Sequence, residues 1–230
     1  MSDVDLRREG AVFVLTMNAG ENRFNRPFLT ALNEALDTVE ASDGPAALVT
    51  TGGTEKFYSN GLDLAWLAGD GQREGAAFVG DVMRFLGRLM AFTVPTVAAM
   101  NGHAFAAGAM MALAHDFRVM RSDRGFMCLN EIDLRIPLAP GMTALVKSRL
   151  PRATLRDMVL TGARIGGDDA RARGIVDEAA AASEVVPHAV TRAAALAEKD
   201  RATYGALKRG LYGETLAVLA AGSLGDFTAR

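Results

Sequence analysis

The sequence predicts an α/β fold. Short apolar runs rich in β-branched residues, such as 12–17 and 46–51, alternate with longer stretches whose apolar residues recur at helical spacing. Signals for tight hairpins are few, so most strands should be joined by crossovers and lie buried in a largely parallel sheet. No fixed-period repeat and no low-complexity linker interrupts the alternation.

The first hundred residues are expected to form three strands and three helices. Pro27 suits the first turn of a helix, where its missing N–H costs nothing, and Asp43-Gly44-Pro45 ends that helix. Asn60-Gly61 is a strong turn signal. The expected strands are 12–17, 46–51 and 96–100, and the expected helices begin at Pro27, Asp63 and Ala76, the last ending at Phe92.

The rest of the chain is expected to be mostly helical. The predicted strands here are 117–120 and 126–128, and the predicted helices are 106–115, 141–150, 151–160, 168–174, 184–198 and 202–221. Strand-like runs cease near Lys199. The sequence therefore predicts a core domain of residues 1–198 followed by a C-terminal helical segment of residues 199–230.

Composition argues against several classes of function. A net charge of −2 over 230 residues disfavours nucleic acid or an anionic membrane as the main partner, and no apolar run approaches the ~20 residues that span a bilayer. Cys128 is the single cysteine, which rules out intramolecular disulfides. Residues 1–10 are too charged for a signal peptide, and residues 227–230 carry no recognisable targeting signal. We therefore expect a cytoplasmic globular protein.

Residues 101–111 are the centre of the predicted site. An apolar strand ends at Asn101-Gly102, small residues follow from Ala106 to Ala109, and an apolar helix opens directly out of them. Small residues let another group approach the backbone, and a helix start presents unpaired N–H groups and the positive end of its dipole. This arrangement suits negative charge. Glu131 lies in an apolar setting about twenty residues on, and is the candidate acid for moving a proton.

Plainer interpretations stay open at this point. Tight strand–helix packing alone also accounts for the small residues, and Glu131 is also compatible with a solvated loop carboxylate. A nucleotide loop is disfavoured, because residues 102–108 lack a closing Lys-Ser/Thr and no G-x-G-x-x-G occurs. His103 is a candidate base whose alternative is simple packing in a turn. His115 and His188 lack metal-ligand spacing, so no metal site is expected.

Three stretches, in order, resemble the crotonase (enoyl-CoA hydratase/isomerase) superfamily. Residues 57–64 resemble its first oxyanion-hole segment and residues 101–108 its second. Leu129-Asn130-Glu131, with Ala139-Pro140 just beyond, looks most like the Δ3,Δ2-enoyl-CoA isomerases. The resemblance covers most of residues 12–180, and it implies a spiral of ββα units with a C-terminal helical segment.

The resemblance implies roles for the matching residues. The backbone N–H groups of Leu62 and Ala107 would form an oxyanion hole for a thioester carbonyl, and Glu131 would be the catalytic acid–base. Hydratases carry a second glutamate at the position of Met110, whereas a single carboxylate suffices to move a double bond from C3–C4 to C2–C3. Further contacts to substrate or CoA are expected from Asn60, Gly61, Asp63, Gly108, Met110 and Lys208.

The resemblance therefore implies a Δ3,Δ2-enoyl-CoA isomerase of fatty-acid β-oxidation. CoA is part of its acyl-CoA substrate, so no cofactor is expected, and relatives assemble as trimers or dimers of trimers. The leucines of residues 207–219 suit burial against the core or another subunit. The alternatives are a hydratase or other reaction on the same scaffold, and a non-catalytic acyl-CoA-binding or assembly protein. Arg135 stands where the family often has Gly, and Gly141-Met142 replaces bulky aromatics of some isomerases, so both should affect the acyl tunnel.

Overall fold

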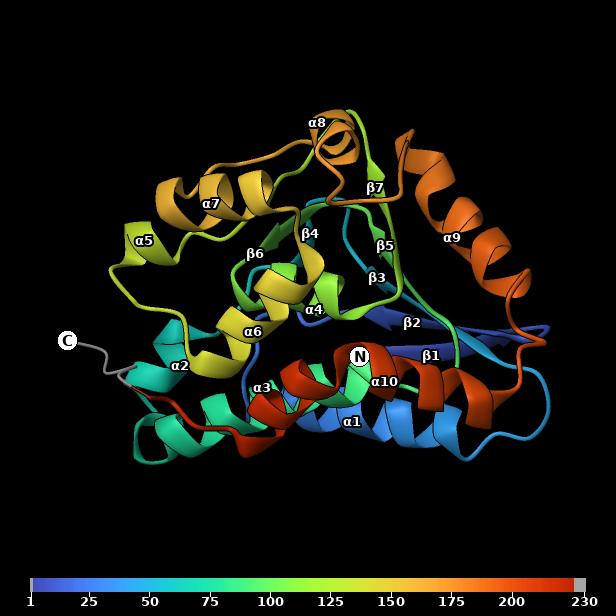
Figure 1. Cartoon of the computed structure of the whole chain (residues 1–230), viewed down its shortest axis with the longest axis horizontal. Helices are drawn as coiled ribbons and strands as arrows, with labels where there is room; N and C mark the ends of the chain where they lie inside the picture. Colours follow the sequence, from blue (N-terminus) through green and yellow to red (C-terminus); the bar gives the residue numbers. More distant parts are fainter. Residues whose placement is uncertain (1, 226–230) are drawn as a thin grey trace.

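The fold is built around a six-stranded sheet (Figure 1). The structure is a computed structural model that describes residues 2–225. The strand order of the sheet is β1-β2-β3-β5-β7-β9. The first pair is antiparallel and every later pair is parallel. The strands are β1 (Val4–Glu9), β2 (Val12–Met17), β3 (Ala47–Gly52), β5 (Thr96–Met100), β7 (Phe117–Arg121) and β9 (Glu178–Ala180).

A second sheet of three short parallel strands repeats the same progression. Its order is β4 (Phe57–Ser59), β6 (His103–Phe105) and β8 (Met127–Cys128). Each of these strands follows a strand of the large sheet, β3, β5 or β7, and is followed by a helix. The chain therefore winds through successive ββα units, which confirms the predicted fold class.

The helices match most of the sequence predictions to within a few residues. At the first, Pro27 lies in the opening turn and the Asn25 side chain accepts the N–H of Phe28 at 3.0 Å, which fixes the helix start. The helices are α1 (Arg26–Glu40), α2 (Leu64–Ala68), α3 (Gly75–Met90), α4 (Ala107–Ala114), α5 (Glu131–Leu134), α6 (Pro140–Arg149), α7 (Arg152–Thr161), α8 (Gly167–Ala172), α9 (Val185–Ala194) and α10 (Arg201–Ala221), with 3-10 turns at Gln72–Glu74 and Ala182–Glu184.

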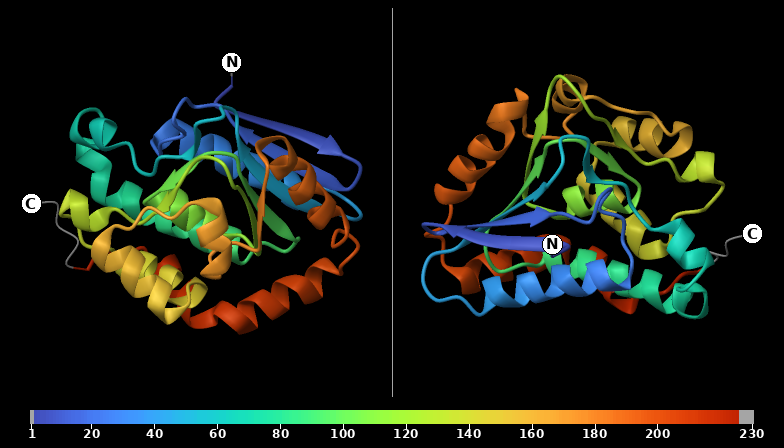
Figure 2. Two further views of the ribbon diagram at one scale, coloured as in Figure 1. Left: turned by 90° about the horizontal axis from the view of Figure 1, so that it is seen from above. Right: turned by 180° about the vertical axis from the view of Figure 1, so that it is seen from behind.

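Alternate residues of the large sheet enter two separate cores. Val12, Val14 and Val49 face α9, whereas Phe13 and Leu15 belong to the larger core that includes α1, α3 and α4. Figures 1 and 2 show α9 on the opposite side of the sheet from α1 and α3. The strands are apolar on both faces because both faces are covered.

Helix α10 packs on α3 and α6 and contributes Leu219 to the larger core. Leu207 and Leu211 lie on its outer side, with 62% and 74% of their surface exposed. The expected apolar face is thus divided between the core and the surface. The division into residues 1–198 and 199–230 stays a prediction, and residues 226–230 lie outside the described part of the chain.

Four strands have no counterpart in the sequence prediction: β1, β4, β6 and β9. β1 pairs with β2 through a turn at Gly10, whose φ of +61° favours glycine. Its charged residues are tolerated because it lies at the sheet edge with most side chains exposed. β6 occupies three residues of the segment expected to be a turn. Within residues 2–225, no helix has the length and apolar character to cross a bilayer.

Candidate active site

A cavity of about 420 Å³ brings together Leu62, Ala107 and Glu131, the three residues that the resemblance assigns to the reaction. It lies where α2, α3, the start of α4 and the segment from α5 to α6 meet. Apart from Glu131, its wall is mainly apolar. The lining residues are Arg23, Asn60, Leu62, Leu64, Leu67, Ala68, Val79, Phe105, Ala106, Ala107, Asn130, Glu131, Leu134, Ile136, Pro137, Leu138 and Met142.

Gly61 allows the two predicted oxyanion-hole segments to approach each other. Its φ is +80°, and a Cβ atom at this position would lie 2.9 Å from the Phe105 carbonyl oxygen and 3.3 Å from the Ala107 nitrogen. A larger residue would separate the segments as well as strain the backbone. The sequence identified Asn60-Gly61 as a turn, and the turn's function here is close packing of two backbones.

The N–H of Leu62 is left free by the way its segment pairs. Phe24 forms a parallel bridge with Leu62, in which the N–H of Phe24 donates to the Gly61 carbonyl at 2.8 Å and the N–H of Asp63 donates to the Phe24 carbonyl at 2.9 Å. Leu62's own N–H therefore faces away from this bridge. No acceptor among residues 2–225 takes a hydrogen bond from it.

The N–H of Ala107 is free because Ala107 is the first residue of α4. Ala106, just before it, has φ 48° and ψ −122°, a conformation that non-glycine residues seldom adopt and that is found mostly at functional sites. Gly108 then packs against β4, since a Cβ atom there would lie 2.3 Å from the Ser59 carbonyl oxygen. No acceptor in the described chain pairs with the Ala107 N–H.

Glu131 is the one carboxyl group on the cavity wall within residues 2–225. Its Oε2 atom is buried and has no hydrogen-bond partner. Burial raises the pKa of Glu131 to about 7, and a hydrogen bond with its own backbone opposes this only in part. The group can therefore take up and release a proton near neutral pH.

The other predicted contacts have varied placements. Asn60 lines the cavity and donates to Glu21 at 2.8 Å. Asp63 caps α2 by accepting the N–H of Trp66 at 3.0 Å, and is not among the lining residues. Met110 is fully buried in the larger core and does not line the cavity either. Its expected role as a substrate contact therefore has no support from its position.

The structure does not bring Lys208 to this cavity. Its ammonium group is buried beneath α10, 2.8 Å from Asp116 Oδ1, and donates to the Phe92 carbonyl at 3.0 Å. This placement corrects the expectation that Lys208 meets a CoA phosphate: the charge neutralises a buried carboxylate and ties α10 to the core. No local pattern indicates this contact, because Asp116 lies 92 positions away in the sequence.

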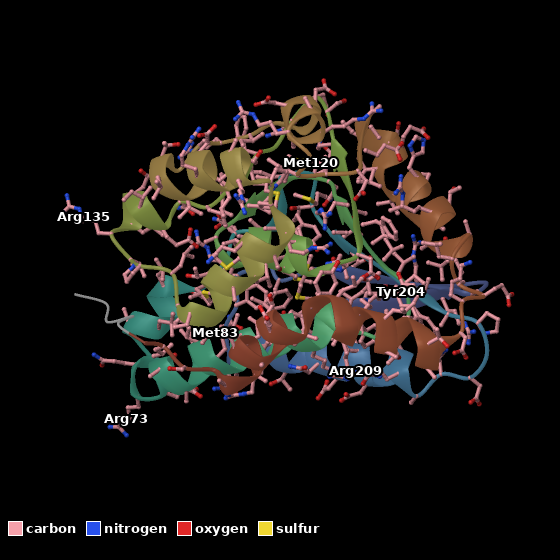
Figure 3. The ribbon with its side chains drawn as sticks, viewed as in Figure 1. Arg73, Met83, Met120, Arg135, Tyr204 and Arg209 are labelled. Carbon is pink, nitrogen blue, oxygen red and sulfur yellow. The ribbon has the colours of Figure 1, made fainter. Side chains whose placement is uncertain are left out.

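His103 and Arg135 also differ from their sequence interpretation. His103 Nδ1 accepts the N–H of Phe126 at 3.2 Å, and its ring stacks on Phe105, so the histidine has a packing role. Arg135 ends α5 in the left-handed conformation with φ 58°, which explains why glycine suits this position. Its side chain points outward at the edge of the molecule rather than into the cavity (Figure 3).

Sequence reasoning missed Asn130 and most of the apolar wall. Asn130 precedes α5, yet its side chain makes no capping hydrogen bond, and its Oδ1 atom is buried without a partner beside the cavity. The wall residues come from α2, α3 and the segment between α5 and α6, which are far apart in sequence. Met142, noted for replacing an aromatic residue, does lie on this wall.

Comparison with known proteins identifies the family of this chain. A family model described as Enoyl-CoA hydratase/isomerase matches residues 7–225. The chain belongs to the enoyl-CoA hydratase/isomerase family. It is an enzyme of that family, and it has the crotonase fold predicted from its sequence.

The named relatives include isomerases and a dehydratase. Enoyl-CoA delta isomerase 2, peroxisomal, of Arabidopsis thaliana is 34% identical over 225 residues, which cover 93% of this chain and 94% of the relative. Carnitinyl-CoA dehydratase of Salmonella enteritidis is 30% identical over 204 residues, 88% of this chain and 77% of the relative. The solved enoyl-CoA isomerase of Mycobacterium tuberculosis has a TM-score of 0.88 at 26% identity and 96% coverage of both chains.

Location and assembly are not decided by these comparisons. The Arabidopsis relative is named as peroxisomal, which differs from the cytoplasmic location expected from the sequence. The cytoplasmic location and the trimeric assembly both stay predictions.

Proposed function

We propose that this enzyme is a Δ3,Δ2-enoyl-CoA isomerase of fatty-acid β-oxidation, which moves a C3–C4 double bond to C2–C3 in an acyl-CoA thioester. One observation carries the proposal: among the residues that the structure describes, the cavity has a single carboxyl group, Glu131, with a buried unpartnered oxygen, together with two backbone N–H groups that have no acceptor. A shift of a double bond needs one group that removes a proton at one carbon and returns it at another. Coenzyme A enters as part of the substrate, and the chemistry requires no cofactor.

The reaction begins with proton removal. The Glu131 carboxylate takes a proton from C2, and the electron pair of that C–H bond moves through C2 and the carbonyl carbon onto the thioester oxygen. The resulting dienolate has its charge on an oxygen held by the N–H groups of Leu62 and Ala107. Each such donor is worth roughly 3 kcal/mol by comparison with other oxyanion holes. Glu131 then returns a proton to C4, and the double bond between C2 and C3 forms as the carbonyl is restored.

The raised pKa of Glu131 fits this task. A carboxyl with a pKa of about 7 is a stronger base than an ordinary glutamate and is still largely ionised in slightly alkaline solution. The α4 dipole adds a favourable field for the oxyanion, because Ala107 stands at the positive end of that helix.

The named dehydratase relative makes hydration the main competing function. Hydration needs one group to activate water and another to place a proton on carbon. The position of the second hydratase glutamate is occupied here by Met110, an apolar residue buried in the core. This favours isomerisation over hydration.

The decisive experiment compares purified enzyme on 3-enoyl-CoA and 2-enoyl-CoA substrates of the same chain length. We expect conversion of the 3-enoyl to the 2-enoyl thioester, with little hydration of the latter. Rapid hydration without isomerisation would refute the proposal. Binding of both thioesters without turnover would instead support the non-catalytic acyl-CoA-binding protein.

A further inference from the structure

The cavity changes in character along its length. Two of its polar members lie beside the free N–H of Leu62: Asn60 on the same segment, and Arg23 next to Phe24, which pairs with Leu62. The other two, Asn130 and Glu131, lie at the start of α5. Val79 and Met142, by contrast, are only 3% and 4% exposed and form a buried apolar part of the wall. A substrate with its carbonyl at Leu62 and Ala107 and its C2 and C4 atoms at Glu131 therefore directs its hydrocarbon tail toward this apolar part.

Leu138 stands at the junction of three hollows. It lines the reaction cavity and also a second hollow of about 530 Å³ against the end of α10. A third groove, of about 270 Å³, runs between α6 and α7 and is lined by Leu138 as well. Among residues 2–225, Pro137 lines the first two hollows and Leu138 alone lines all three.

The second hollow has surfaces suited to a hydrocarbon chain. It is lined by Val218 of α10 and Leu224 just beyond that helix, and by Pro140 and Ala144 of α6, with Lys147 as its cationic member. A tail that passed the Leu138 side chain would therefore remain in contact with apolar groups. Pro137 and Leu138 line both this hollow and the reaction cavity, so they lie between the two spaces.

The backbone at Leu138 is well suited to hold a wall in place. Pro137 fixes the φ angle immediately before it, and Pro140 opens α6 just after it. Ala139 between them is fully buried. The loop is therefore anchored on both sides of Leu138, and changing its side chain should alter the space available with little movement of the backbone.

We propose that Leu138 is the residue that sets the acyl-chain length of this enzyme. The inference rests on the proposed function, and it narrows the substrate class to 3-enoyl-CoA thioesters whose tails end within the reaction cavity. A longer tail requires the side chain of Leu138 to give way. Shortening that side chain connects the cavity to the second hollow, and enlarging it shortens the cavity.

The test measures kcat/KM for isomerisation of 3-hexenoyl-, 3-octenoyl-, 3-decenoyl-, 3-dodecenoyl- and 3-hexadecenoyl-CoA. In the wild type, kcat/KM should rise about fourfold for each added methylene that fits in the cavity. The chain length at which kcat/KM stops rising is called the break. Leu138→Ala should move the break to longer chains, and Leu138→Phe should move it to shorter ones. A break at the same length in all three proteins would overturn the inference.

The matched control is Leu160→Ala. Leu160 lines the third groove but not the reaction cavity and is 65% exposed, so the break should stay where it is in the wild type. Thermal unfolding of each variant verifies that it is folded. If the same break shift appeared in Leu160→Ala, the effect would not be due to the wall and the inference would fail.

Binding separates this inference from the proposed function. Titration calorimetry with saturated acyl-CoA thioesters of the same lengths measures the dissociation constant without any turnover. If the break shifts in Leu138→Ala and Leu138→Phe, the role of Leu138 as the limit on chain length is supported, even when no isomerisation is found. In that case only the proposed function fails. If the enzyme isomerises its substrate but the break stays at the same chain length in both assays, the role of Leu138 is rejected and the proposed function stands.

Discussion

Replacing Glu131 with Gln tests the site through protein stability as well as through turnover. Burial raises the pKa of Glu131 from its ordinary value of 4.5 to about 7. Each pKa unit is worth about 1.36 kcal/mol, so the difference corresponds to about 3 kcal/mol. The folded protein binds this proton more tightly than the unfolded chain does. The stabilisation is therefore fully present below about pH 4.5 and is lost as pH rises through about 7.

Glutamine cannot ionise, so the free energy of unfolding of Glu131→Gln lacks this pH-dependent decrease. Between about pH 5 and pH 8, the free energy of unfolding of the wild type should fall by about 2.5 kcal/mol relative to that of Glu131→Gln. Urea unfolding of both proteins at the two pH values, at one protein concentration, measures the difference. Contributions from other titrating groups are common to both proteins and cancel.

Glu214→Gln is the matched control, because Glu214 is an exposed glutamate on α10. It should follow the wild type at both pH values. Isomerase turnover of Glu131→Gln should fall about 100- to 10,000-fold, as expected for loss of a general base, while acyl-CoA binding persists. Identical pH dependence of stability in wild type and Glu131→Gln would mean that the carboxyl is solvated, and would refute the reasoning about its basicity.

Three more predictions concern the same site and its support. The kcat/KM for isomerisation should increase with pH through about 7 and then level off, because the base must be ionised; a profile without this limb would exclude Glu131 as the base. Ala106→Gly should retain turnover and stabilise the protein by about 1 kcal/mol in urea unfolding, because it relieves a φ of 48°. Lys208→Met should cost roughly 3–5 kcal/mol of stability, because it removes the only ion-pair partner that the described residues give Asp116, a carboxylate 11% exposed that keeps only its hydrogen bonds from Thr96 and Tyr204. The acyl-CoA dissociation constant should be unchanged below the unfolding transition; weakened binding at full stability would restore Lys208 as a CoA contact.

That Leu62, Ala107 and Glu131 line one cavity could be predicted, because each lies in a local motif that resembles the family. A free N–H at a helix start follows from helix geometry wherever an apolar helix opens out of small residues. The turn at Gly61 is likewise encoded by two adjacent residues. The strands and helices were predictable to a similar extent, since most have their own apolar periodicity.

What sequence reasoning missed depends on contacts between distant segments. Nothing near Lys208 indicates that its charge meets Asp116 inside the protein rather than a phosphate outside it. Strand β1 has the composition of a solvated segment, and it is ordered only because β2 supplies an edge for it to pair with. The position of Leu138 between hollows depends on how α6, α7 and α10 meet, which no local pattern records.

The proposed preference for isomerisation over hydration rests on Met110, a residue that does not line the cavity. Met110 lies on α4, three residues after Ala107, so the same helix positions Met110 and one of the two proposed oxyanion donors. Because Met110 is fully buried, it contributes apolar packing where a carboxylate would carry a large desolvation cost. On the proposed function, an apolar Met110 leaves Glu131 as the one carboxyl group at the cavity within residues 2–225. A single acid can carry a proton between two carbons, and no second acid is present there to activate water.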